Sequence, residues 1–114
     1  MHNLRTTRNQ WLEAYYSGNH DVLAVLEADD FCVKENNRIT KNDWRYQHIE
    51  RLVKQGKWQP EKLREKDIQF HQVSDTEYRV TATVYSDIVQ MSIEEKWRLE
   101  TGQWRVTFLG MVAL

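Results

Sequence analysis

One carboxylate breaks the alternation of a predicted strand near the carboxyl end of the chain. In the stretch "SIEEKWRLETGQW", residues 92–104, Glu95 shares a face with Ile93 and Trp97, because side chains two apart in a strand point the same way. An apolar environment disfavours the charged form of a carboxyl group unless a cation or hydrogen-bond donors approach it. We expect Glu95 either to line a pocket, where it could do chemistry, or to be satisfied by a nearby base or at an exposed sheet end.

Two further residues could act together with Glu95. Glu35 shares the parity of Val33 on a predicted strand over 31–36, so both side chains are expected on one face. If Tyr78 lies beside Glu95 on a neighbouring strand, Glu35 could accept a proton while Glu95 or Tyr78 donates a hydrogen bond to a developing oxyanion. The alternatives are an exposed strand end for Glu35 and a hydrogen-bonded core position for Tyr78.

Aromatic side chains are numerous enough either to line such a pocket or to fill it. The chain has five Trp, five Tyr and three Phe among 114 residues. Large rings fill a small core, and they also line apolar pockets. The candidate ligand-binding residues are Trp11, Tyr15, Trp44, His48, Phe70, Met91, Trp97 and Phe108. The alternatives are core packing for Trp11 and Trp44 and a satisfied core histidine for His48.

The first half of the chain predicts three helices and a short strand. The predicted bounds are 3–17, 20–28 and 41–55 for the helices and 31–36 for the strand. Gly18 and Gly56 follow the first and third helices as natural stops, and Asn19 can cap the second.

The second half predicts a four-stranded antiparallel meander with one apolar face. Its strands are expected over 67–73, 77–85, 88–99 and 103–112. A two-residue turn at 86–87 would pair Tyr78 with Glu95, and a turn at 101–102 would pair Glu95 with Phe108. Helices segregated from an antiparallel sheet make an α+β architecture.

The outer face of this meander carries a possible contact surface. The same register puts Leu109 and Met111 on that face, and an exposed apolar patch predicts a homodimer contact there. A solvated sheet face is the alternative. The register also places Arg98 opposite Arg105, an unfavourable pair that a partner chain or a bulge would relieve.

Two stretches carry a resemblance over nearly the whole chain. The opening "WLEAYYSGNHDVLAVLEADDFCV" and the ending "KWRLETGQWRVTFLG" are similar to the first and last parts of the nuclear transport factor 2-like superfamily, among which SnoaL-like and uncharacterised members look closest. The resemblance implies a single domain over 1–114. In this domain, three N-terminal helices pack in the concave face of a curved, mainly antiparallel sheet, which forms a cone-shaped half-barrel. A pocket at the open end and a homodimer through the outer sheet face are also implied.

The steroid isomerase branch of this superfamily can be compared residue by residue. Its general base matches Glu35, and its second acid, which is held protonated as a hydrogen-bond donor, matches Glu95. Both matching side chains are one methylene longer than in that branch. Its first-helix tyrosine matches Trp11, which has an indole N–H instead of a hydroxyl. Functions in the superfamily range from isomerases, cyclases and dehydratases to non-catalytic binding modules, so fold alone does not select one.

Composition excludes several other classes of function. Sixteen basic and seventeen acidic residues are interleaved, with a net charge of −1, which argues against nucleic-acid binding. The single cysteine allows neither an internal disulfide nor a Cys-based zinc site, and no histidine pair has metal-ligand spacing. We expect no cofactor. The first twenty residues contain no apolar run, so we expect neither a signal peptide nor a membrane span, and a cytoplasmic location.

Three functional hypotheses remain. The first is a binding module that holds a small apolar or aromatic ligand in the cone pocket. The second is an isomerase, cyclase or dehydratase that uses Glu35 as base and Glu95 with Tyr78 as hydrogen-bond donors. The third is a non-catalytic dimeric interaction scaffold with a filled core. The missing hydroxyl at Trp11 counts against the second, and the acids Glu35 and Glu95 count against the third.

Overall fold

The order of helices and strands along the chain is close to the predicted one. The computed structural model describes residues 3–114, which form three helices and six strands. The helices are α1 (Leu4–Ser17), α2 (His20–Leu26) and α3 (Asn42–Lys54). The strands are β1 (Glu27–Glu35), β2 (Arg38–Lys41), β3 (Arg64–Ser74), β4 (Glu77–Tyr85), β5 (Gln90–Glu100) and β6 (Gln103–Ala113). No helix among residues 3–114 is long and apolar enough to cross a bilayer.

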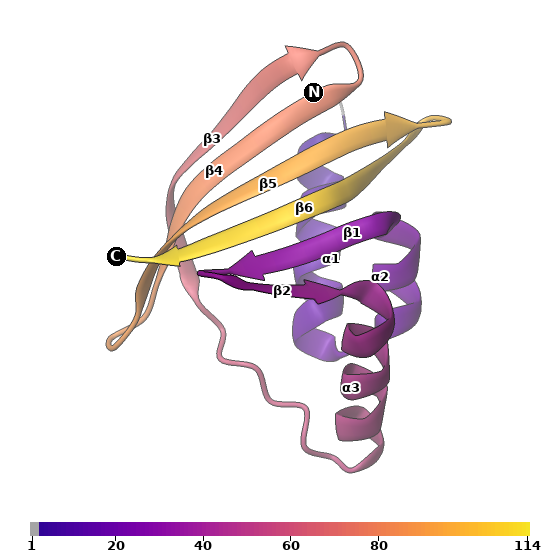
Figure 1. The fold of residues 1–114 in the computed structure, drawn as a ribbon, viewed down its shortest axis with the longest axis vertical. Coiled ribbons are helices and arrows are strands. Elements are labelled where there is room, and N and C mark those ends of the chain that lie inside the picture. The colour runs from indigo at the N-terminus through magenta and orange to yellow at the C-terminus, as the bar shows by residue number, and fades with distance from the viewer. Residues whose placement is uncertain (1–2) are drawn as a thin grey trace.

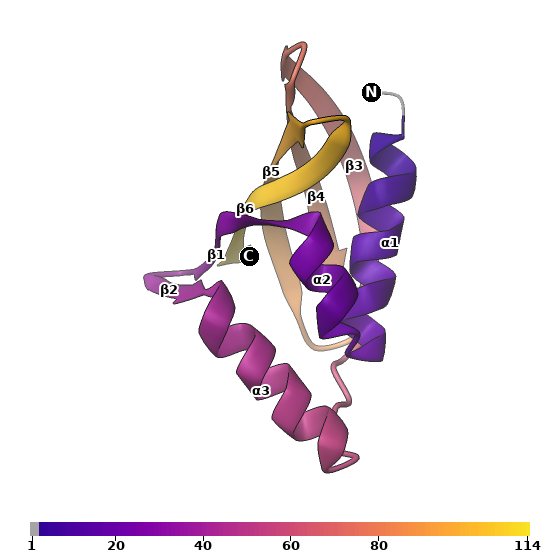
Figure 2. The ribbon, with the colours of Figure 1, turned by 90° about the vertical axis from the view of Figure 1, so that its right-hand side faces the viewer.

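The six strands make one curved, open sheet in the order β2-β1-β6-β5-β4-β3. Only the β1–β6 pair is parallel, and the other neighbours are antiparallel. All three helices lie on the concave side of the sheet, and α3 leans away from the strands (Figures 1 and 2). This confirms the predicted α+β fold, in which three N-terminal helices pack in the concave face of a mainly antiparallel sheet.

Short local contacts begin and end the helices. Gly18 ends α1 with a φ of 74°, and its backbone N–H bonds back into the last turn. The Asn19 side chain then accepts a hydrogen bond of 3.2 Å from the Val22 N–H, which caps α2 as predicted. The predicted second helix is shorter than expected, because the chain turns into β1 at Glu27.

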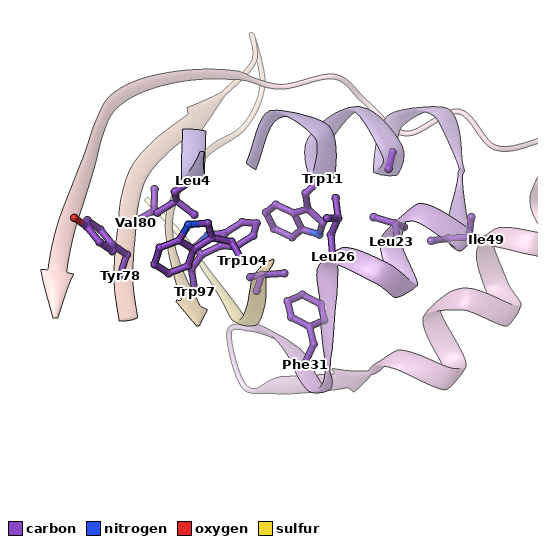
Figure 3. Packing of buried hydrophobic residues seen from close by; sticks show 12 residues of the cluster. Leu4, Trp11, Leu23, Leu26, Phe31, Ile49, Tyr78, Val80, Trp97 and Trp104 are labelled. Carbon is purple, nitrogen blue, oxygen red and sulfur yellow. The ribbon is translucent and has the colours of Figure 1, made fainter. Parts of the chain in front are cut away.

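Aromatic rings pack together with aliphatic side chains in the core between α1 and the sheet (Figure 3). Trp11 packs edge-on against Trp97, with ring centroids 5.5 Å apart, and against Phe31 at 6.2 Å. At the far end of the core, Tyr78 packs edge-on against Trp104 at 5.7 Å. Burying each ring contributes about 1.5–3 kcal/mol, so this cluster is the main anchor of α1 on the sheet.

The pairing of β4 with β5 differs from the predicted register by two residues. The connecting turn spans four residues instead of two, because the Ser86 hydroxyl accepts hydrogen bonds from the backbone N–H groups two and three residues later. Tyr78 therefore lies opposite Trp97, and Glu95 lies opposite Val80. The predicted Tyr78–Glu95 pair is wrong, although an even shift keeps every side chain on its predicted face.

A bulge in β6 reverses the faces of the last residues. Thr107 is an extra residue between the Trp97–Val106 and Lys96–Phe108 pairs, and its hydroxyl donates a hydrogen bond of 3.2 Å to the Lys96 carbonyl. Beyond this bulge each side chain points to the face opposite the one that simple alternation gives.

Three predicted positions are corrected by this bulge. Phe108 lies on the outer face beside Lys96, and not opposite Glu95 on the inner face. Leu109 takes the place opposite Glu95, and Leu109 and Met111 line the concave side instead of the outer face. The apolar pair that predicted a dimer contact is therefore not on the outer surface.

The pairing of Arg98 with Arg105 is confirmed, and no bulge separates the two residues. Carboxylates of the same chain separate the two guanidinium groups. Glu100 contacts Arg98 at 2.9 Å and Arg105 at 3.3 Å, and Asp30 contacts Arg98 at 3.3 Å. Two negative charges thus offset the repulsion of two positive ones at this end of the sheet.

Candidate functional site

The concave side of the sheet contains a pocket of about 420 Å³. It lies among α1, α3, the segment that joins α3 to β3, and the inner face of the strands. The ring-bearing side chains that line it are Trp11, Tyr15, Tyr16, Trp44, His48 and Trp58. The charged side chains are Arg8, Glu35, Arg45, Glu61, Glu65 and Glu95. The volume falls in the range of small-molecule sites, and the wall is mainly apolar with a few polar groups, as such sites usually are.

Glu95 is fully buried at one wall of this pocket and accepts three hydrogen bonds. Arg8 donates from Nε to Oε1 and from Nη2 to Oε2, both at 2.8 Å, and Trp97 donates from Nε1 to Oε1 at 2.8 Å. Guanidinium and indole N–H groups can only donate, so both carboxylate oxygens act as acceptors. This geometry suits an ionised carboxylate, and not the protonated donor that the resemblance implied for Glu95. The alternative of a nearby base is the one observed.

Arg8 also contacts a second carboxylate. Its Nη2 lies 2.8 Å from Oε2 of Glu65, and its Nη1 lies 3.5 Å from Oε1. Burial by itself lowers the pKa of Arg8, but the hydrogen bonds and charges of Glu95 and Glu65 outweigh burial and hold this pKa above its ordinary value. We call Glu65, Arg8 and Glu95 the Glu–Arg–Glu cluster.

The helical spacing of α1 indicates that Arg8 faces the core, although the sequence analysis did not include it in the candidate site. Arg8 lies one turn after Leu4 and one turn before Trp11 on the apolar stripe of α1, so a charged side chain was bound to face the core. Glu65 was missed because β3 begins at Arg64, earlier than the predicted start at residue 67.

Glu27 is a second buried carboxylate that the sequence did not reveal. It is 1% exposed and accepts hydrogen bonds of 2.7 Å from the Trp11 indole, the Arg45 guanidinium and the Tyr46 hydroxyl. Burial raises the pKa of Tyr46 above its ordinary value, and the negative charge of Glu27 raises it further. The Trp11 N–H, which the sequence resemblance matched to a hydroxyl of the steroid isomerases, therefore binds a carboxylate of the same chain.

Two carboxylates at the rim of the pocket form no ion pair with the residues that the structure describes. Glu35 lies exposed at the end of β1, in register with Met111 of β6, and faces the concave side as predicted. Glu61 is exposed on the segment before β3. None of the ion pairs formed within residues 3–114 includes either one. Burial raises the pKa of the neighbouring lining residue Tyr15, the charge of Arg45 opposes this rise, and the charge of Glu35 adds a smaller contribution to it.

Some of the residues predicted for the site line the pocket and others do not. Those that line it are Glu35, Glu95, Trp11, Tyr15, Trp44, His48 and Met91. Those outside it are Tyr78, Phe70, Trp97 and Phe108. Tyr78 is a core residue against Trp104, at the opposite end of the core from the pocket residue Ile49 (Figure 3). Its hydroxyl is therefore not placed to meet a ligand in the pocket.

The other three residues outside the pocket have different partners. Phe70 lies under the Arg5 guanidinium, whose carbon is 4.3 Å from the ring centroid. Trp97 is buried beneath the pocket wall and donates its indole N–H to Glu95. Phe108 lies on the outer face, where the Lys96 ammonium is 4.9 Å from its ring centroid.

His48 lies at the pocket and not in the core. Its ring stacks on Trp44 with centroids 4.9 Å apart and an interplanar angle of 11°. Arg51 Nη2 lies 3.0 Å from His48 Nδ1, and since a guanidinium only donates, Nδ1 is the acceptor. The Trp44–His48 pair is thus a flat aromatic wall on α3.

Comparison with known proteins gives structural matches without sequence matches. No family model matches the chain, and no curated protein matches it. The fold matches a nuclear transport factor 2-like protein of Cytophaga hutchinsonii with a TM-score of 0.80 and 14% identity, over 97% of this chain and 95% of that one. It also matches a nuclear transport factor 2-like protein of unknown function in nutrient uptake from Rhodospirillum rubrum, with a TM-score of 0.77 and 14% identity, over 97% and 98%.

A third match is a ketosteroid isomerase candidate of Shewanella frigidimarina, with a TM-score of 0.72 and 14% identity, over 93% of this chain and 91% of that one. At such identity a structural match shows the fold and says nothing of the activity. These three matches cover 93–97% of this chain. The protein therefore has the nuclear transport factor 2-like fold that its sequence predicted.

Proposed function

We propose that this chain is a binding module that holds a small apolar or aromatic ligand in the concave pocket. The observation that carries the proposal is the open volume of about 420 Å³ beside Glu95, walled by rings from α1, α3 and the segment before β3. A core filled by its aromatic side chains, which the scaffold hypothesis requires, would leave no such space. Pockets of this size bury most of the surface of a drug-sized molecule.

The geometry supports binding better than proton transfer. An isomerase, cyclase or dehydratase needs a base and an acid that face the same substrate atoms. Glu35 lies at the rim, but both oxygens of Glu95 accept hydrogen bonds from Arg8, and Tyr78 lies away from the pocket. The proposed acid is thus missing, whereas a binding role requires none.

A homodimer through the outer sheet face remains part of the proposal, with different contact residues. Phe108 and Val112, which is 58% exposed, now lie on that face in place of Leu109 and Met111. A homodimer through these two side chains would leave the concave pocket open. Light scattering after gel filtration of wild type and Val112→Lys tests the homodimer. We expect wild type to be a dimer and Val112→Lys to be a monomer, because a lysine at this contact would dissociate the two chains. A monomeric wild type would contradict the homodimer.

The experiment that tests the binding proposal blocks the pocket with a ring. Thr40 lines the pocket from β2, and Thr83 faces the outer side of the sheet on β4. A thermal-shift screen of small amines, alcohols, ketones and acids is run on wild type, Thr40→Trp and the matched control Thr83→Trp. We expect compounds that raise the Tm of wild type and Thr83→Trp but not of Thr40→Trp, since a ligand stabilises only the state that binds it. No stabilising compound, or equal shifts in all three proteins, would contradict the proposal.

A further inference from the structure

The Glu–Arg–Glu cluster leaves an unbalanced negative charge in the pocket wall. One guanidinium faces two carboxylates, which gives a net charge of −1. The side chains of Arg8 and Glu95 are 4% and 0% exposed, and that of Glu65 is 20% exposed. Water can therefore offset little of this charge, and a buried charge without full compensation is costly.

The two arginines that line the pocket in the described part of the chain are both committed to carboxylates. Arg8 directs Nε, Nη1 and Nη2 toward Glu95 and Glu65. Arg45 is neutralised by Glu27 at 2.7 Å. An anionic ligand would meet no uncommitted cation among the lining residues that the structure describes.

The rim adds further negative charge. Glu35 and Glu61 line the pocket and form no ion pair in the described part of the chain. The basic residues near the pocket that do not line it include Arg38, which is directly opposite Glu35 in the β1–β2 pair. Lys62 lies 6.0 Å above the Tyr16 ring, and Arg51 donates to His48. Counted over the side chains that line it, with two arginines and four glutamates, the pocket is net negative.

The aromatic walls suit a cation as well. The faces of Trp and Tyr rings attract cations within about 6 Å, and desolvation strengthens the attraction. The Trp58 indole donates a hydrogen bond of 2.9 Å to the Tyr15 carbonyl and its ring packs edge-on against Tyr15, so neither ring needs to be ordered by a ligand. Tyr16, another lining ring, has the Lys62 ammonium 6.0 Å from its centroid, at the outer limit of this attraction.

We infer that the ligand is an organic cation, a small amine or quaternary ammonium carried on an apolar or aromatic body. This inference rests on the proposed binding function and adds the charge of the ligand to it. The cationic group lies at the rim carboxylates Glu35 and Glu61, the Glu–Arg–Glu cluster adds negative potential from the pocket wall, and the apolar body packs against the rings. A neutral ligand of the same shape gains only the packing, and an anion is repelled.

The test compares three ligands of similar shape by isothermal titration calorimetry at neutral pH and low ionic strength. They are para-hydroxyphenyl-trimethylammonium, its neutral isostere para-tert-butylphenol, and the anion para-tert-butylbenzoate. We expect the cation to bind about tenfold more tightly than the phenol, and the benzoate to bind most weakly.

Charge-removing variants show where the preference arises. Glu35→Gln and Glu61→Gln each weaken binding of the cation about three- to tenfold and leave the phenol unchanged within about twofold. Both side chains are exposed, so these variants fold. The matched control is Asp75→Asn, an exposed acid in the β3–β4 turn far from α3 (Figure 1), which changes neither affinity.

Each outcome decides one of the two proposals. Equal or tighter binding of the phenol, or a cation affinity that neither glutamine variant changes, overturns the cationic ligand and leaves the binding function standing. Binding of none of the three at about 10 mM overturns the cationic ligand. If the screen on Thr40→Trp also finds nothing, the binding function fails with it.

Discussion

Removing the Arg8 side chain is the sharpest test of how the fold holds Glu95. In Arg8→Met the apolar stem is retained, but the guanidinium that binds both oxygens of Glu95 at 2.8 Å is lost. Glu95 is 0% exposed, so it becomes a buried carboxylate whose only remaining donor is the Trp97 indole. Breaking a buried pair in this way costs about 3–5 kcal/mol.

This free energy corresponds to a large change in melting temperature. A chain of 114 residues, at about 2.1 cal/mol/K of unfolding entropy per residue, loses about 4 °C in Tm per kcal/mol. We expect Arg8→Met to melt about 12–20 °C below wild type in circular dichroism. The matched control is Arg79→Met, which breaks the exposed pair with Glu94 and costs about 0–1 kcal/mol.

A double variant separates the loss of charge balance from the loss of packing. Arg8→Met with Glu95→Leu removes both charges of the buried pair, and it leaves the Trp97 N–H without its acceptor and the partly exposed Glu65 without its guanidinium partner. We expect it to recover at least about half of the lost stability, because apolar replacements of a buried pair are often neutral. An Arg8→Met variant as stable as Arg79→Met, or a double variant less stable than the single one, would refute the account of this cluster.

Three further predictions concern other parts of the chain. Glu27→Gln weakens all three of the hydrogen bonds to that carboxylate and should lower the unfolding free energy by about 2–4 kcal/mol in urea titrations, and an unchanged midpoint would contradict this. Gly18→Ala should cost more than Gly102→Ala, since both have positive φ but only the new Cβ at residue 18 would come within 2.6 Å of Val53; equal Tm values would contradict it. Because the pKa of Tyr46 is raised in the folded state, its neutral side chain stabilises the fold below about pH 10, and this stabilisation is lost as the pH rises further. Tyr46→Phe should therefore have a lower Tm than wild type at neutral pH and a shallower fall in Tm at alkaline pH. Parallel curves of Tm against pH for the two proteins would contradict this.

The sequence predicted what local periodicity controls. Helical spacing and the glycine stops gave the three helices, and strand alternation put Glu95 and Glu35 on the concave face. The two stretches that resemble the nuclear transport factor 2-like superfamily gave the order of the elements, and structural matches confirm that fold. The presence of a base beside Glu95 was also foreseen as an alternative, but its identity was not.

What the sequence could not predict depends on contacts between distant segments. A shift of two residues between β4 and β5 keeps all faces the same, so alternation cannot distinguish Val80 from Tyr78 as the neighbour of Glu95. The bulge at Thr107 carries no local pattern, yet it moves Leu109 from the outer face into the pocket. Bulges arise from how two strands pair, which a single strand does not specify.

The buried carboxylate of Glu27 illustrates the same limit at a helix end. The run of apolar residues in α2 continues smoothly to Ala28, so the helix was predicted to include Glu27. The chain instead enters β1 there, because a parallel pairing with β6 places Glu27 opposite Val106. That pairing joins residues far apart in sequence, and in the resulting fold the Glu27 carboxylate lies within hydrogen-bond distance of the Trp11 indole N–H.

The indole signals in a ¹H–¹⁵N NMR titration test the central claim, an open pocket that binds a small molecule, most directly. Trp44 and Trp58 line the pocket, whereas Trp104 lies in the core at the other end and serves as the internal control. On titration with a compound that stabilises the protein in the thermal-shift screen, we predict saturable shifts of the Trp44 and Trp58 signals and a stationary Trp104 signal. Stationary signals from Trp44 and Trp58 at saturating ligand, or equal movement of all three, would contradict the claim.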